Sequence, residues 1–176
     1  MNTVVLFGIT GGYISEEIKR VLSHYGIFSI CGTSIESNVK EPTFLVEEYS
    51  ARDDISKGTG IVVLIGEIGN NCVLNIPSSY KGIAYSGDIN ALQLLKKNNI
   101  TTLICGMCES DTLILSSISE NTASICLQRK IITVNGEIIE PREYPIKLKN
   151  KITDYALLAA FGILLLSGIE PLDFCY

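Results

Sequence analysis

One stretch near the N-terminus constrains the fold more than any other, because it alternates an apolar run, a turn, an amphipathic helix and a second apolar run. Residues 3–8 form the first run, which is typical of a strand covered on both faces. Residues 15–25 follow, with apolar side chains at i, i+3, i+4 and i+7, the spacing of one helical face. Residues 27–32 form the second run. This order predicts a parallel β-α-β unit with a right-handed crossover.

The same alternation continues along the chain. Asp88 is a suitable N-cap for a second helix, which we expect to run to about Asn98. Further strands are expected at residues 43–49, 61–65, 82–85 and 101–105. Strands that alternate with helices in this way predict an α/β fold with a mostly parallel sheet and helices on its faces.

The pattern changes after Gly106. Residues 112–118, 123–134 and 137–148 are expected to form a three-stranded antiparallel meander, in which Asn135-Gly136 is a two-residue hairpin signal. Pro141 and Pro145 confine the last of these strands to an edge of the sheet. A closing helix is expected over residues 153–167. We therefore predict a single domain over residues 1–176, an α/β fold that is Rossmann-like or P-loop-like with this C-terminal meander and closing helix.

Composition narrows the class of protein. The 176 residues are 47% hydrophobic, which excludes wholesale disorder, and the net charge of −5 argues against nucleic acid as a partner. Six cysteines raise the question of a disulfide framework, but a chain of this length and apolar content does not need one. The first residues lead directly into a strand without the features of a signal peptide, so we expect a cytoplasmic protein.

The apolar run at residues 155–169 is shorter than the roughly 20 residues of a membrane-spanning helix, so we expect a buried helix and no membrane partner. Apolar side chains lie all round this helix, and only 19% of the chain is charged. A helix of this kind must be buried on every side. We therefore expect a homo-oligomer or a protein partner that uses the helix or the adjacent tail, which ends at Tyr176.

A candidate site follows the first strand. A strand, a glycine-containing turn and a helix N-terminus can bind an anion through free backbone N–H groups. The candidate ligand contacts in this loop are Gly8, Thr10, Gly11, Gly12 and Ser15, with Ser15 as the expected helix N-cap.

The loop does not have the chemistry of a Walker A motif. That motif needs a Gly-Lys-Ser/Thr ending, whereas here the first lysine is Lys19. Glu16 and Glu17 fall in the expected first helical turn, where they would repel phosphate. The other interpretation of the loop is an ordinary tight turn between a strand and a helix.

The order of these segments resembles the central ATPase domain of the Mur ligases, the ATP-dependent amide ligases of peptidoglycan precursor synthesis. The resemblance covers nearly the whole chain and is carried by residues 4–11, 32–33, 44–47, 83–88, 102–106 and 156–160. It implies that Glu47 corresponds to the family's magnesium-binding glutamate. It also implies that Asp88 ends the strand that carries the family's Asn-Ala-Asp-Asp motif.

Several departures from the family pattern suggest that nucleotide chemistry is lost. The P-loop lysine position falls on Ser15, the Asp-His pair is replaced by residues 71–72, and the His-Asn pair by residues 152–153. The resemblance also covers neither of the two flanking domains of the family. We therefore expect a non-catalytic domain with a degraded nucleotide site that binds a partner or a small ligand. No cofactor is expected, although residual nucleotide or magnesium at Asp88 and Glu47 stays open.

Two alternatives remain at this stage. The chain could be a fragment of an ATP-dependent amide ligase that another chain completes. The sequence Cys105-Gly106-Met107-Cys108 could instead be a redox pair or half of a zinc site, with Cys72 or Cys126 as further ligands. Two unconnected cysteines near a strand end are the simpler interpretation of this motif.

Overall fold

The computed structural model describes residues 1–8, 12–31, 34–49, 55, 58–66, 68–69 and 72–171. Its helices are α1 (Gly12–Leu22), the short 3₁₀ helix η1 (Ser23–Tyr25), α2 (Ile89–Lys97) and α3 (Asp154–Leu166). Its strands are β1 (Asn2–Phe7), β2 (Ile27–Cys31), β3 (Ser34–Ser37), β4 (Phe44–Tyr49), β5 (Ile61–Leu64), β6 (Lys81–Tyr85), β7 (Thr101–Gly106), β8 (Leu113–Ile118), β9 (Thr122–Leu127), β10 (Ile131–Ile132), β11 (Ile138–Ile139) and β12 (Arg142–Lys147).

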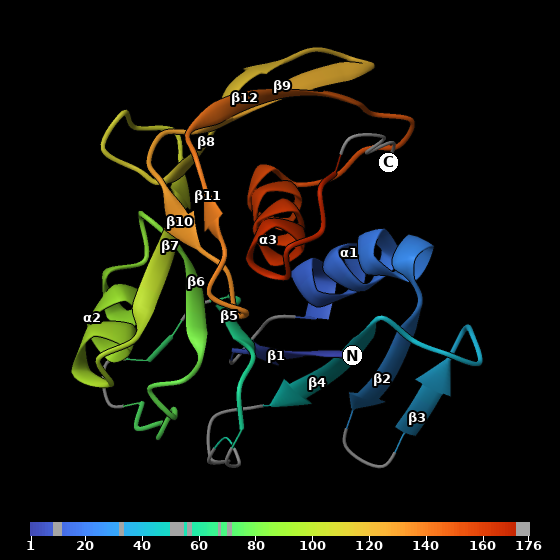
Figure 1. The fold of residues 1–176 in the computed structure, drawn as a ribbon, viewed down its shortest axis with the longest axis vertical. Helices are drawn as coiled ribbons and strands as arrows, with labels where there is room; N and C mark the ends of the chain where they lie inside the picture. The colour runs from blue at the N-terminus through green and yellow to red at the C-terminus, as the bar shows by residue number, and fades with distance from the viewer. Residues whose placement is uncertain are drawn as a thin grey trace.

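The described strands form a ten-stranded sheet in the order β12-β9-β8-β7-β6-β5-β1-β4-β2-β3 and a separate two-stranded sheet, β10-β11 (Figure 1). Strand β1 lies in the interior of the large sheet, where it pairs in parallel with both β4 and β5. The pairings at the two ends, β2 with β3, β8 with β9, and β9 with β12, are antiparallel. The predicted α/β fold with a mostly parallel sheet is confirmed.

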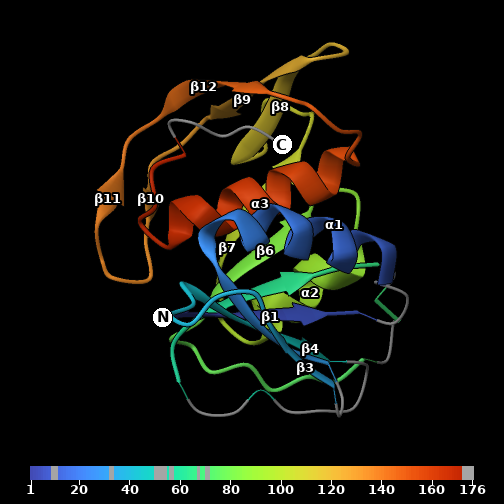
Figure 2. The ribbon, with the colours of Figure 1, turned by 90° about the vertical axis from the view of Figure 1, so that its right-hand side faces the viewer.

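Helices cover both faces of the sheet, which explains why the first apolar run does not alternate. Figure 2 shows α1 and α3 side by side on one face, and α2 lies on the other. Val4 and Leu6 point into the core under α1 and α3, whereas Val5 and Phe7 point into the second core on the α2 side. All four side chains are at most 1% exposed, so both faces of β1 are buried.

Helix α3 is buried by its own chain, which corrects the prediction that this helix forms the interface with a partner. Strands β9 and β12 curve over the helix (Figure 1), and the rings of Tyr144 in β12 and Phe161 in α3 meet edge to face at 5.1 Å. Every residue from 156 to 166 is buried. The helix therefore presents no apolar face to a partner, and residues 172–176 of the tail lie outside the described part. Within that part, no helix is both long and apolar enough to span a membrane.

The C-terminal meander differs in detail from the expectation. Residues 123–134 split into β9 and β10, and residues 137–148 split into β11 and β12, because the β10-β11 hairpin leaves the large sheet. The hairpin has a three-residue loop rather than a two-residue one. Thr133 and Glu137 pair across it, and Gly136 adopts φ +87°, the bulge position that glycine favours. The edge position of the strand containing Pro145 is confirmed.

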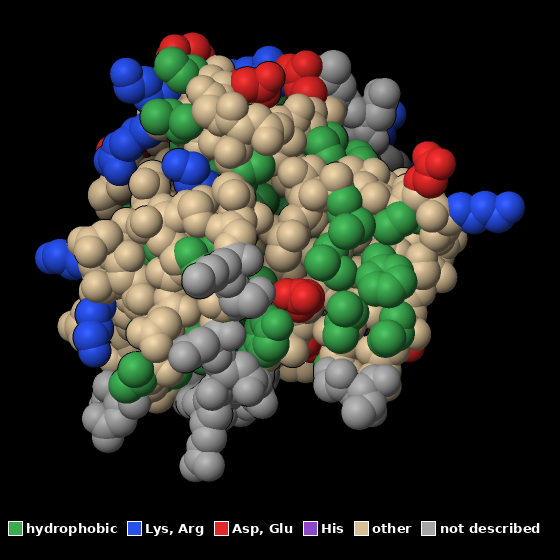
Figure 3. Space-filling view, turned by 60° about the horizontal axis from the view of Figure 1, so that its bottom comes forward, with side chains coloured by type: hydrophobic (Ala, Val, Ile, Leu, Met, Phe, Trp, Pro, Cys, Tyr) green, Lys and Arg blue, Asp and Glu red, His purple; other side chains and the backbone are tan. Residues whose placement is uncertain are grey.

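Strand β3 is an additional edge strand that the sequence did not predict, because all four of its residues are exposed and polar residues outnumber apolar ones. Next to it, Phe28, Ile30, Ile35 and Leu45 share one side of the sheet by register, the side that faces away from α1. We call these four residues the edge face. Figure 3 shows apolar side chains gathered there. The exposed apolar surface of the described chain therefore includes this sheet edge rather than α3.

Candidate functional site

The loop after β1 is only partly described, because Thr10 and Gly11 lie outside the described residues. Helix α1 begins at Gly12, so the expectation that Ser15 caps the helix is wrong. Glycine's low helix propensity suggested a loop at this position, but the helix begins there, about one turn earlier than expected. Ser15 is fully buried inside α1, and its hydroxyl makes no hydrogen bond with the described residues.

The two described glycines of the loop differ in the space that is available for a side chain. A Cβ atom on Gly8 would lie 1.6 Å from the carbonyl oxygen of Ile65, so the close approach of two strand ends excludes any side chain there. A Cβ atom on Gly12 would meet nothing within 4 Å. Gly8 is therefore required by packing, whereas the space beside Gly12 is open.

The two glutamates of α1 do not face the loop as expected. They lie beyond the first helical turn, which contains no acidic residue. Glu16 is exposed and pairs with Lys19. Glu17 is only 5% exposed, and its Oε2 accepts hydrogen bonds from the backbone N–H of Thr153 at 3.1 Å and from the Thr153 hydroxyl at 2.6 Å. Glu17 thus caps the N-terminus of α3 from a neighbouring helix and does not act as a barrier to phosphate.

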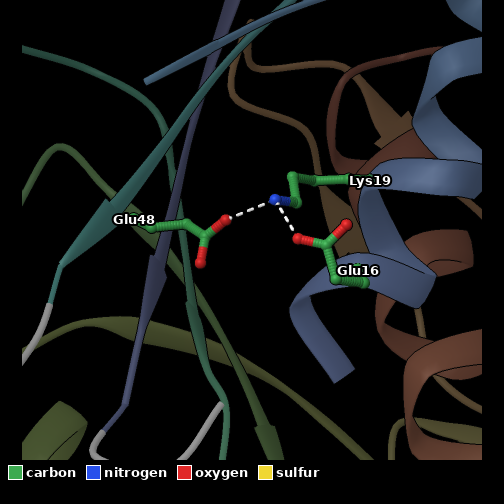
Figure 4. Close-up of polar contacts among 3 residues, drawn as sticks. All are labelled: Glu16, Lys19 and Glu48. Carbon is green, nitrogen blue, oxygen red and sulfur yellow. Dashed lines mark ion pairs between the residues drawn. The ribbon is translucent and has the colours of Figure 1, made fainter. Parts of the chain in front are cut away.

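Lys19 links α1 to the sheet (Figure 4). Its Nζ atom lies 2.7 Å from Oε1 of Glu48 in β4, and it also contacts Glu16. Burial lowers the pKa of Lys19, but the hydrogen bonds and charges of Glu16 and Glu48 outweigh this effect and hold the pKa above its ordinary value. Lys19 is therefore engaged with two carboxylates.

Glu47, the predicted magnesium ligand, points to the opposite face of β4 from Glu48. Its Oε2 accepts a hydrogen bond from the hydroxyl of Tyr49 at 3.4 Å, and its charge helps to raise the pKa of Tyr80, after burial, the larger cause. Glu47 and Asp88 belong to β4 and to the end of β6, which are three strand spacings apart. At about 4.8 Å per spacing, the strands are roughly 14 Å apart, so the two carboxylates do not share one metal ion.

Asp88 has the predicted place at the start of α2. Its Oδ1 accepts a hydrogen bond from the backbone N–H of Ala91 at 2.9 Å, and the helix ends at Asn98 as expected. Asp88 also lines a cavity of about 650 Å³ at the carboxyl ends of β5 and β6, which we call the tyrosine cavity. Its lining consists of Ile14, Leu64, Gly66, Ile68, Tyr85, Gly87, Asp88, Ile89, Asn90 and Tyr155.

The cavity has an aromatic wall and few polar groups. The ring centroids of Tyr85 and Tyr155 are 5.7 Å apart, and the Tyr155 hydroxyl donates a 2.6 Å hydrogen bond to the carbonyl of Leu64. Burial raises the pKa of Tyr155 well above its ordinary value, with smaller effects from Cys105 and Asp88. The amide of Asn90 donates to the carbonyl of Ile68 at 3.0 Å. The Tyr155 hydroxyl and one N–H of the Asn90 amide therefore stabilise the wall itself.

The sequence predicted Asp88 as a site residue but not the two tyrosines. Tyr85 is the last residue of its strand, and ligands of open α/β sheets bind beyond the carboxyl ends of the strands. That rule could have identified Tyr85. No comparable signal marks Tyr155, which the sequence places within a uniformly apolar helix.

The cysteine motif lies elsewhere and is divided between core and surface. Cys105 is fully buried, and burial, followed by the charge of Asp111, raises the pKa of its thiol far above the ordinary value. Cys108 is exposed, and its backbone N–H donates to Asp111. The described cysteines are free thiols. Among the described residues, no group of three or more His, Cys, Asp or Glu side chains is placed to hold a metal ion.

Comparison with known proteins adds evidence on the fold. No family model and no curated protein sequence matches the chain. Among solved structures, it is similar to a UDP-N-acetylmuramoyl-L-alanyl-D-glutamate–2,6-diaminopimelate ligase, with a TM-score of 0.59, 11% identity and coverage of 96% of this chain and 43% of the ligase. It is also similar to the MurF ligase of Thermotoga maritima in complex with ADP, with a TM-score of 0.53, 13% identity and coverage of 96% and 46%. The chain thus spans less than half the length of these enzymes, and what it shares with the Mur ligases is the fold.

Proposed function

We propose that the chain is a Mur-ligase-like domain that binds a small ligand in the tyrosine cavity without catalysing a reaction on it. The observation that carries this proposal is the cavity itself, which lies at the carboxyl ends of parallel strands, where open α/β sheets bind ligands. Its volume falls within the range of small-molecule sites, about 300–1,000 Å³, and its lining combines apolar side chains with a few polar groups.

The non-catalytic part of the proposal rests on charge and position. Phosphoryl transfer needs cations that neutralise the moving charge at one place. The P-loop lysine position is Ser15, which is buried, and Lys19 is engaged by two glutamates. Glu47 lies on β4 and Asp88 follows β6, and these two strands are not neighbours in the sheet. These features favour a binding role over ATP hydrolysis.

A thermal-shift screen with Mg-ATP, Mg-ADP, UDP-sugars and a set of small organic compounds tests the proposal. A ligand present at 100 times its Kd should add about 2.7 kcal/mol to the free energy of unfolding. The matched control is Ile89→Arg, which places a long side chain in the cavity at a position that is 66% exposed. We expect stabilisation of the natural chain and none of this variant. Equal stabilisation of both would place the ligand elsewhere, and Mg-ATP turnover would favour the ligase-fragment alternative.

A second function, self-association, is favoured by the edge of the sheet. Strand β3 is the last strand in the sheet, so half of its backbone N–H and C=O groups point away from the molecule. The edge face lies beside it, and Ile35 is 65% exposed. We propose that a second copy of the chain pairs with β3 across a two-fold axis, so that the sheets and the edge faces become continuous.

Light scattering at about 100 µM tests self-association, because a dimer with a Kd in the micromolar range is evident at that concentration. We expect a dimer for the natural chain and a monomer for Ile35→Lys, which places a charge on the exposed edge strand. Ile138→Lys, at a similarly exposed isoleucine (61%) in the separate β10-β11 sheet, is the control and should leave the dimer intact. A monomeric natural chain would contradict the proposal.

A further inference from the structure

We infer that the tyrosine cavity selects a ligand with a positive charge, an organic ammonium or amidinium group on an apolar body. The inference rests on the proposed function, since it assumes that this cavity is the binding site. Among its described lining residues, Asp88 is the one charged side chain, and the two tyrosine rings stand on the same wall. A carboxylate and aromatic rings, with no Lys or Arg side chain among the described lining residues to neutralise the charge, favour a cationic ligand.

The charge of Asp88 is only partly compensated by its surroundings. Its Oδ1 atom accepts the hydrogen bond from Ala91, and Asp88 forms none of the ion pairs found among the described residues. The N-terminus of α2 contributes about half a positive charge against one full negative charge on the carboxylate. The α2 end of the cavity therefore stays net negative, with one carboxylate oxygen left for a ligand.

The aromatic wall supplies the second attraction. A cation within about 6 Å of a tyrosine ring is attracted by the negative face of the ring. Tyr85 is 45% exposed, so part of its ring is open to a guest. Gly87 sets the position of the ring, because a Cβ atom on Gly87 would lie 2.6 Å from Cε1 of Tyr85. The glycine lets the ring fold back over the chain beside Asp88.

The same lining disfavours a phosphate. The hydroxyl of Tyr155 and the amide N–H of Asn90 already donate to the carbonyls of Leu64 and Ile68. A phosphate would therefore meet the Asp88 carboxylate without a side-chain cation among the described lining residues, and the Tyr155 hydroxyl would not be free to donate to it. The inference thus predicts a ligand of opposite charge to a nucleotide.

Three probes that share a benzyl group separate charge from shape: benzyltrimethylammonium, benzyl alcohol and benzylphosphonate. Their dissociation constants are measured by NMR titration of the full chain, with Ile89→Arg as the cavity-blocked control. We expect the cation to bind about tenfold more tightly than the alcohol, and the phosphonate to bind most weakly of the three. Binding of the cation and of the uncharged alcohol should be lost in the Ile89→Arg variant, and loss of the alcohol shows that the cavity is blocked independently of charge.

Two pairs of variants test the residues. Asp88→Asn keeps the helix cap, since asparagine caps as well as aspartate. It should raise the Kd of the cation about fivefold and leave the Kd of the alcohol unchanged. Glu120→Gln removes the same charge from an exposed turn and should change neither probe. Tyr85→Leu should weaken binding of the cation more than binding of the alcohol. Tyr85→Phe, which retains the ring, should not weaken cation binding selectively.

The outcomes of these experiments separate the preference for a cation from the proposed ligand-binding function of the cavity. Phosphonate binding as tight as cation binding, or an Asp88→Asn variant that binds the cation normally, would overturn the inference while the cavity remains the site. Absence of binding by every probe, or equal binding in the Ile89→Arg variant, would count against the proposed function itself.

Discussion

Glu17 offers the sharpest test of how the fold is held together. The sequence suggested a carboxylate at the phosphate loop, whereas the structure places it as a cap on α3, with two hydrogen bonds to Thr153 and 5% of its surface exposed. A hydrogen bond to a charged group contributes about 1.5–3 kcal/mol. Glu17→Ala removes two of them, so we expect a loss of about 3 kcal/mol in the free energy of unfolding.

The size of this loss makes it easy to measure. For a chain of this length, about 3 kcal/mol corresponds to a decrease in Tm of roughly 6–12 °C. Urea unfolding followed by circular dichroism gives the free energy directly. Glu17→Gln, which keeps an acceptor oxygen but no charge, should lose about 1 kcal/mol.

The adjacent residue provides the control. Glu16 is exposed and pairs only with the nearby Lys19, so Glu16→Ala should stay within about 0.5 kcal/mol of the natural chain. Faster hydrogen exchange of the Thr153 amide in Glu17→Ala would locate the effect. The reasoning is refuted if Glu17→Ala costs no more than Glu16→Ala, because the buried cap would then contribute nothing.

Three further predictions concern other parts of the chain. Gly8→Ala should prevent stable folding because its Cβ atom has no space, whereas Gly12→Ala should be neutral or stabilise by up to about 1 kcal/mol; thermal unfolding compares them. Because the pKa of Lys19 is raised on folding, its ion pairs stabilise the chain below about pH 10.5 and this stability is lost as pH rises through the folded-state pKa. The difference in unfolding free energy between the natural chain and Lys19→Met should thus shrink above pH 10.5, and a constant difference would contradict it. Iodoacetamide should label Cys108 and spare Cys105 in the native chain, since burial keeps the Cys105 thiol protonated; mass spectrometry would detect the opposite order or a disulfide between them.

The order of elements could be predicted because periodicity alone carries it. The apolar run that became β1 and the amphipathic pattern of α1 each have one structural solution in a sheet covered by helices. The capping role of Asp88 was equally local, since a cap is set by residues within one turn.

What could not be predicted depends on contacts between distant segments. Glu17 and Thr153 are 136 residues apart, and no local pattern links a helix glutamate to the start of another helix. The burial of α3 depends on β9 and β12 curving over it, and a uniformly apolar helix does not reveal whether its own chain or a partner covers it. Strand β3 was missed because an exposed edge strand has no buried face to create an alternating pattern.

The same limit applies to the site. The glycine loop attracted attention because its motif is local, and the Mur-ligase resemblance placed the ligand there. The tyrosine cavity is assembled from β5, β6, α1, α2 and α3, so its lining becomes visible only when the topology brings these elements together. Tyr155 in particular joins the cavity through a hydrogen bond to Leu64, 91 residues away.

The most direct test of the tyrosine cavity as a site for cationic ligands is NMR of isoleucine δ1 methyl groups during titration with benzyltrimethylammonium. Ile14, Ile68 and Ile89 line the tyrosine cavity, whereas Ile35 lies on the edge face and Ile138 in β11 of the β10-β11 hairpin. The account predicts saturable shifts of the three cavity methyl groups and none at the other two. Shifts confined to Ile35 or Ile138, or no shift at the cavity methyl groups, would contradict it.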